Sequence, residues 1–168
     1  MSVKYVMDEM LDMSVIPNKY VAHWDETKYV TMSSFVFMGP AIYGYYNEMY
    51  KHAIILFLVS IISANFWRDA TYSYRRILDR LYSKFGFIFF VKEGIIYVRY
   101  PPFVIIGWCA FCILLRCYYL SNKYSGKPQH AWWKYHVTFH LLMGMNQYII
   151  INSIIHSENN DCKQYKIE

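Results

Sequence analysis

Long apolar stretches separated by short polar and charged ones dominate the sequence. The stretches long enough to form helices are 29–46, 52–67, 103–120 and 132–155. Each approaches the roughly 20 apolar residues that a helix needs to cross a bilayer core of about 30 Å. The pattern predicts an all-α fold, a polytopic membrane helix bundle with four spans. The expected organisation is a polar N-terminal arm, a transmembrane helical domain and a polar C-terminal tail, over 1–28, 29–156 and 157–168.

A different pattern follows the second apolar stretch. Apolar residues recur there at the three- and four-residue spacing of one helix face: Tyr74, Ile77, Leu78, Leu81 and Phe85. Arginines precede the stripe or lie mostly off it: Arg68, Arg75, Arg76 and Arg80. This pattern predicts an interfacial amphipathic helix in the headgroup plane, with arginines that could bind lipid phosphates. The alternative is a solvated basic connector that only holds the topology.

The segment 85–102 has two apolar halves divided by the charged pair Lys92 and Glu93. In water this pattern would predict a β-hairpin. In lipid, the edges of an open hairpin could not be hydrogen-bonded. A short fifth span or a re-entrant segment is therefore the alternative, and Pro101 and Pro102 can start the next helix.

The distribution of Lys and Arg predicts the orientation. With four spans, one side carries 12 of these residues and the other carries four. Because basic residues concentrate in cytoplasmic loops, both termini are then expected to be cytoplasmic. A fifth span would move the C-terminal tail outside and leave eleven basic residues on the cytoplasmic side. The count does not decide between four and five spans.

Composition supports a membrane protein. The chain has 168 residues, of which 56% are hydrophobic and 17% charged, whereas soluble domains are about 45–50% apolar and about 25% charged. The net charge is +5, but the basic residues lie between apolar segments, so we expect no nucleic-acid partner. The expected partners are membrane lipids, together with a second copy of the chain or other membrane proteins.

Three of the four cysteines, Cys109, Cys112 and Cys117, lie within one apolar stretch. This arrangement does not suit a secreted disulfide framework. Because no second Cys-x-x-Cys pair is present, we interpret Cys109 and Cys112 as small apolar packing residues rather than as metal ligands.

Two histidines lie four residues apart near the start of the last apolar stretch, in "WWKYHVTFHLL". On a helix, His136 and His140 share one face, and Gln147 lies almost above His136. One face of the second stretch carries His52, Ser60, Ser63 and Trp67. If the two faces meet, Ser63 and the two histidines would be neighbours.

This constellation resembles the alkaline-ceramidase-like membrane hydrolases, the CREST group. That family has a serine, a histidine four residues later, an aspartate shortly after, and a His-x3-His pair on a late helix. The matching residues here are Ser63, Asp79, His136 and His140, whereas Trp67 stands where the family has its first histidine. The resemblance covers two short segments, and the family has seven spans. It implies a zinc-dependent lipid amidohydrolase or a degenerate relative, in which zinc activates a water molecule against an amide.

Under this interpretation, Ser63 and Asp79 are the catalytic candidates, and His136 and His140 are zinc ligands. A catalytic zinc takes three protein ligands and a water molecule, which it makes acidic enough to supply hydroxide near neutral pH. Ser63 would stabilise the developing oxyanion. The third ligand would come from one of Asp79, Asp69 and His52.

The histidines also have a simpler interpretation, because histidines in membrane helices often hydrogen-bond to neighbouring helices. A proton or ligand pathway is another. Three function classes follow. The first is a non-enzymatic membrane component, such as an envelope, scaffold or lipid-contacting protein. The second is the zinc-dependent hydrolase. The third, a transporter or channel, would require this short chain to oligomerise.

Overall fold

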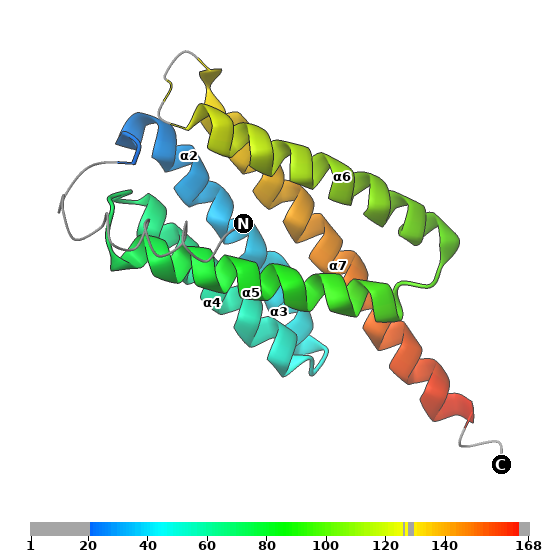
Figure 1. Cartoon of the computed structure of the whole chain (residues 1–168). Coiled ribbons are helices and arrows are strands. Elements are labelled where there is room, and N and C mark those ends of the chain that lie inside the picture. Colours follow the sequence, from blue (N-terminus) through cyan, green and yellow to red (C-terminus); the bar gives the residue numbers. More distant parts are fainter. Residues whose placement is uncertain (1–20, 126, 128–129, 165–168) are drawn as a thin grey trace, which may run out of the picture.

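The computed structural model describes residues 21–125, 127 and 130–164, with side chains up to Ser157. All regular elements in this part of the chain are helical, which confirms the all-α prediction (Figure 1). They are α2 (Trp24–Ser34), η2 (Phe35–Phe37), α3 (Met38–Tyr46), α4 (Tyr50–Trp67), α5 (Tyr74–Tyr97), α6 (Pro101–Tyr124) and α7 (Trp132–Gln164).

The helices run up and down alongside one another (Figure 1). The chain keeps its direction from α2 through η2 into α3, and it reverses at each later connection. We call one end of the bundle the α4–α5 end, which also holds the α6–α7 connection. The opposite end, the α5–α6 end, also holds the α3–α4 connection. Helix α7 contacts α2, α3, α5 and α6, whereas α4 contacts α2, α3 and α5. These two helices therefore form the centre of the bundle.

The first apolar stretch folds as two helices joined by the 3₁₀ turn η2. Pro40 lies in the first turn of α3, where its missing N–H costs least. Short 3₁₀ segments commonly join helices at such points. The turn ends at Phe37, and one residue separates it from the Gly39-Pro40 pair. Helix α2 starts at Trp24, inside the expected polar arm, of which residues 1–20 lie outside the described part.

The segment 74–97 differs from the expectation. Helix α5 is continuous, so the predicted interfacial helix and the ambiguous segment after it form one element, and Lys92 and Glu93 lie within this helix without dividing it. Gly86 and Phe90 are buried, and a Cβ on Gly86 would lie 3.2 Å from Val59 of α4. Close packing against α4 therefore stabilises a helix that local β-propensity disfavours.

Three clusters of buried side chains follow one another along the bundle. The first contains Ala22, Val30, Phe66, Trp67, Ala70 and Trp132. The second contains Phe37, Val59, Leu114 and Met143. The third contains Ala41, Leu56, Phe90 and Ile151. The core thus takes residues from all of the helices and holds them as one bundle.

Two of the described helices, α4 and α6, are long and apolar enough to cross a membrane, by length and composition alone. The four-span bundle is therefore not confirmed by this measure. At the other end of the chain, α7 continues to Gln164, so the first part of the expected polar tail is helical.

The prediction that Cys109 and Cys112 are packing residues is wrong within this bundle. Cys109 and Cys112 are exposed, and Cys117 is buried. Helix α6 contacts the bundle through the narrow stripe that contains Leu114, Cys117 and Ser121. At 100° per residue, Cys109 and Cys112 point away from that stripe.

Candidate functional site

A series of buried polar side chains crosses the bundle. We call it the polar chain, and it consists of Asp79, Ser63, Ser34, Ser33, His140, His136 and Ser121. These residues come from α5, α4, α2, α7 and α6. The polar chain therefore brings together side chains from every long helix of the described bundle, through hydrogen bonds, the adjacent backbone positions of Ser33 and Ser34, and the contact between the two imidazole rings.

The first half of the polar chain joins α2, α4 and α5. Ser34 Oγ donates a hydrogen bond to Ser63 Oγ at 3.2 Å. The hydroxyls of Ser63 on α4 and Ser83 on α5 lie next to the Asp79 carboxylate. Ser60 Oγ adds a bond to the Ser34 carbonyl at 2.9 Å. Asp79 Oδ1 has no hydrogen-bond partner among the described residues. Burial of a half-satisfied carboxylate is costly, so this half depends on the neighbouring hydroxyls of Ser63 and Ser83.

The second half of the polar chain contains both histidines. His140 Nδ1 is hydrogen-bonded to Ser33 Oγ of α2 at 2.8 Å. His136 Nδ1 is hydrogen-bonded to Ser121 Oγ of α6 at 3.0 Å. The two imidazole rings lie 4.7 Å apart, centroid to centroid. Each histidine thus bonds a different neighbouring helix, which is the geometry expected of polar contacts between packed helices.

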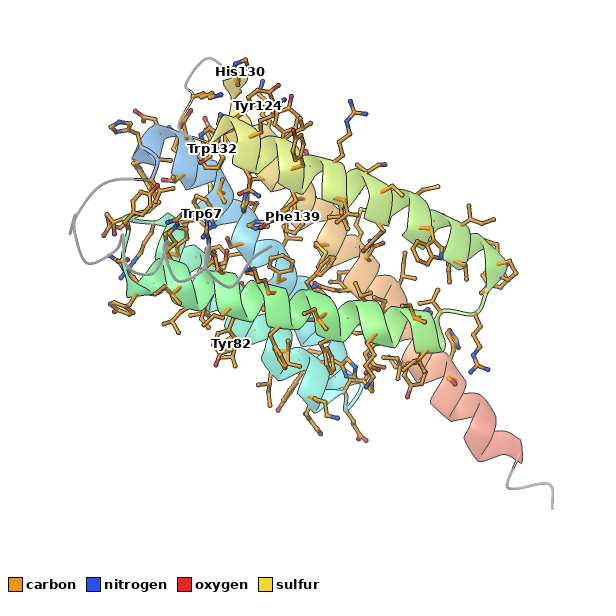
Figure 2. The ribbon with its side chains drawn as sticks, in the orientation of Figure 1. Trp67, Tyr82, Tyr124, His130, Trp132 and Phe139 are labelled. Atoms are coloured by element: carbon orange, nitrogen blue, oxygen red, sulfur yellow. The ribbon has the colours of Figure 1, made fainter. Side chains whose placement is uncertain are left out.

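Trp67 closes the histidine pair on the side of the α4–α5 end. Its ring lies 4.7 Å from the His136 ring, edge to face, and 5.6 Å from the Trp132 ring. Figure 2 shows Trp67 and Trp132 at that end of the bundle. Trp132 Nε1 in turn donates to Glu26 Oε2 at 2.8 Å. Trp67, at the position where the resembled family has a histidine, therefore packs against His136 as an aromatic side chain.

The described residues do not fit a three-ligand zinc site. Among them, no three His, Cys, Asp or Glu side chains are grouped so that they could hold a metal ion. The three candidates for a third ligand have other contacts. Asp79 lies next to Ser63, Asp69 pairs with Arg75, and His52 Nε2 lies 3.8 Å from Glu93 Oε2.

The sequence predicts that Ser63 lies beside His136 and His140. In the structure, Ser63 is connected to the histidines only through residues of α2. Ser33 and Ser34 of α2 lie between them, and each bonds one side. Sequence reasoning missed these two serines and Ser121. The available signal was the adjacent pair of serines inside the first apolar stretch, because buried hydroxyls require a partner.

The four arginines considered for headgroup binding all belong to the α4–α5 end. Arg68 and Arg75 line a polar hollow there together with Asp69. Arg75 pairs with Asp69. Asp79, four residues after Arg75 on the same helix, is buried in the bundle and does not take part in this pair. Arg76 lies over the Tyr72 ring at 4.3 Å, and Arg80 is exposed. This end therefore presents several cationic groups on one side of the bundle.

The fold and the site together define an all-helical bundle with a hydrogen-bonded polar chain in its interior. The sequence matches no family model, no curated protein and no solved structure. The resemblance to the alkaline-ceramidase-like hydrolases therefore stays an expectation from Ser63, Asp79, His136 and His140.

Proposed function

We propose that the chain is a small multi-pass integral membrane protein that acts as a non-enzymatic, lipid-contacting component. Helix α6 carries the proposal. It has 24 residues, and only 11% of the residues in its most apolar 18-residue stretch are buried within the bundle. A core helix of a soluble protein would be mostly buried, so the exposure of α6 favours lipid as its surroundings.

The exposed side chains of α6 explain why lipid is the better solvent. The large apolar ones are Ile105, Ile106, Trp108, Ile113, Leu115, Tyr118 and Tyr119. Leaving such surface in water costs about 25 cal/mol for each Å². Monomeric soluble proteins rarely expose contiguous apolar patches beyond a few hundred Å². A bilayer would cover this face without any further protein.

The positions of the charges support the same proposal. Helix α6 has no charged residue from Pro101 to Leu115, and α4 has no Asp, Glu, Lys or Arg from His52 to Trp67. Both segments could lie in the hydrocarbon core with their charges at the bundle ends. The up-and-down path of the helices favours the five-span alternative, in which α5 also crosses (Figure 1). The more basic α4–α5 end would then be cytoplasmic.

The polar chain supports a structural role for the buried histidines and serines. Their hydrogen bonds join pairs of helices, as between Ser33 and His140 and between Ser121 and His136. In membranes such bonds contribute about 0.6–2 kcal/mol each and help to select one packing arrangement. A zinc-dependent hydrolase would need a third ligand, which the described residues do not bring to the two imidazoles.

Extraction of cell membranes at alkaline pH tests the proposal. Carbonate opens vesicles and releases peripheral and soluble proteins, whereas integral proteins stay with the lipid. We expect the full-length chain to remain in the pellet and to enter the supernatant only with detergent, because the α6 surface stays in the bilayer. Release by carbonate as a folded monomer would contradict the proposal.

A further inference from the structure

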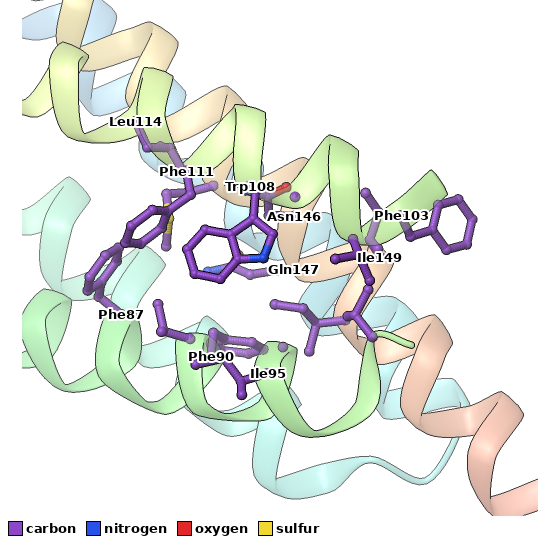
Figure 3. Close-up of a pocket in the computed structure, with 17 residues that line it drawn as sticks. Phe87, Phe90, Ile95, Phe103, Trp108, Phe111, Leu114, Asn146, Gln147 and Ile149 are labelled. Carbon is purple, nitrogen blue, oxygen red and sulfur yellow. The ribbon is translucent and has the colours of Figure 1, made fainter. Parts of the chain in front are cut away.

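An apolar pocket lies between α5, α6 and α7, on the side of the α5–α6 end (Figure 3). Its volume is about 210 Å³. Its lining includes Phe90, Trp108, Phe111 and Ile150 and contains no charged side chain. A charged ligand would therefore be left without a counter-ion, so the lining favours a neutral, largely hydrocarbon occupant.

Two polar side chains, Asn146 and Gln147, interrupt the apolar lining, and Gln147 is the more deeply buried of the two. Gln147 lines the pocket, is only 3% exposed, and reaches toward its interior beneath Trp108 (Figure 3). Its Oε1 has no hydrogen-bond partner among the described residues. A buried amide oxygen without a donor is costly. This unpaired acceptor is a second observation, independent of the pocket, that indicates a ligand with a donor group.

The size and depth of the pocket restrict the ligand further. A volume of 210 Å³ is below the roughly 300–1,000 Å³ of sites for drug-sized ligands, which favours a single chain over a two-chain lipid. The lining runs along α6 from Phe103 to Leu114, which is about 16 Å at 1.5 Å per residue. That length matches about half of a 30 Å bilayer core. The pocket could therefore hold one chain within one leaflet.

We infer that this pocket binds a neutral single-chain lipid that carries a hydroxyl group. The hydroxyl donates to Gln147 Oε1, and the hydrocarbon chain lies along Phe90, Trp108 and Phe111. A hydroxyl satisfies the buried amide oxygen without bringing a charge into the pocket. The inference rests on the proposed membrane location, because it requires the pocket to open to lipid.

Photolabelling of the full-length protein in phosphatidylcholine vesicles tests this inference. The two probes are a sixteen-carbon alcohol with a mid-chain diazirine and the matching alkane without the hydroxyl. After illumination, mass spectrometry locates the labelled peptides. We expect the alcohol to label the lining segments of α5, α6 and α7 about tenfold more than the alkane, since the hydroxyl pairs a buried acceptor.

Two variants test separately the contribution of the ligand hydroxyl and that of the free space in the pocket. Gln147→Leu should lower the ratio of alcohol to alkane labelling about tenfold, to near one, because the acceptor is removed. Gly107→Trp should abolish labelling of the pocket by both probes. A Cβ at Gly107 meets no atom within 4 Å, so the new side chain has room to fill the pocket. The matched control is Ile106→Trp, which adds the same ring at an exposed neighbouring position.

The outcomes distinguish this inference from the proposed function. Flotation of the same vesicles shows whether the chain is inserted. An inserted chain that shows no labelling of the pocket, or equal labelling by alcohol and alkane, overturns the inference and leaves the membrane proposal intact. A chain that does not float with the vesicles overturns both. Labelling unchanged in Gly107→Trp would place the lipid elsewhere and also overturn the inference.

Discussion

Replacing Ile113 by arginine is expected to keep α6 out of the bilayer in most chains, while the other spans hold the protein in the membrane. Ile113 lies at the middle of α6, and 49% of its surface is exposed. An arginine at the centre of a spanning helix costs about 2.5–3.5 kcal/mol of insertion free energy, which corresponds to about a hundredfold change in the insertion equilibrium. The reaction of Cys109 with a charged maleimide in native membranes, compared between Ile113→Arg and the unchanged chain, measures the effect: Cys109 should become reactive when α6 is not inserted.

If water surrounded α6 instead, the same substitution would have little effect. In water, an exposed isoleucine to arginine change would alter stability by no more than about 0.5 kcal/mol. Tyr119→Arg is the matched control, because Tyr119 is 60% exposed but lies closer to the α6–α7 connection, where arginine can reach the interface. We expect α6 to stay inserted in this control, with Cys109 protected. Equal reactivity of Cys109 in both variants would mean that lipid does not surround α6.

Replacing Phe90 by alanine is expected to lower the free energy of unfolding by about 3–5 kcal/mol. Phe90 is 2% exposed and belongs to the cluster that contains Leu56 and Ile151. Removal of its ring leaves a cavity between α4, α5 and α7 that neighbouring side chains fill only in part. Denaturant titration of the purified protein in detergent micelles, followed by the change in helicity, measures the loss.

Phe85 provides the control for this change on the same helix. Its side chain is 55% exposed, so Phe85→Ala should alter the free energy of unfolding by no more than about 0.5 kcal/mol. A difference between the two variants supports α5 as one continuous helix with a single buried face. Equal losses would contradict the packing of α5 against α4 and α7.

The apolar stretches were sufficient to predict most of the helices. α4 and α6 begin within two residues of the predicted starts, because each stretch ends at charged or proline residues that set its limits. α5 was misread. Its second half is rich in Phe, Ile and Val around Lys92 and Glu93, a composition that favours strands locally. Burial of Gly86 and Phe90 against other helices decides the outcome, and a local pattern contains no such information.

The candidate site was predicted in part for the same reason. The four-residue spacing of His136 and His140 places them on one face of any helix. Which helices they meet depends on the packing of the bundle, so the roles of Ser33 and Ser121 could not be read from the sequence. Gln147 was predicted to share a face with His136, but the pocket that it lines is formed by three separate helices.

The reactivity of Cys109 and Cys112 tests the membrane account most directly. Both are exposed on the face of α6 that points away from the bundle.

In a chain with Cys117 and Cys162 replaced by serine, a charged maleimide is added to native membranes, and total thiols are then counted after denaturation. Lys123→Cys, in a background that also lacks Cys109 and Cys112, adds a control thiol near the exposed end of α6. The reaction requires a thiolate in contact with water. We therefore expect Cys109 and Cys112, which face lipid, to react only after denaturation. The control thiol should react in open membranes. Reaction of Cys109 and Cys112 as fast as the control would contradict the membrane account.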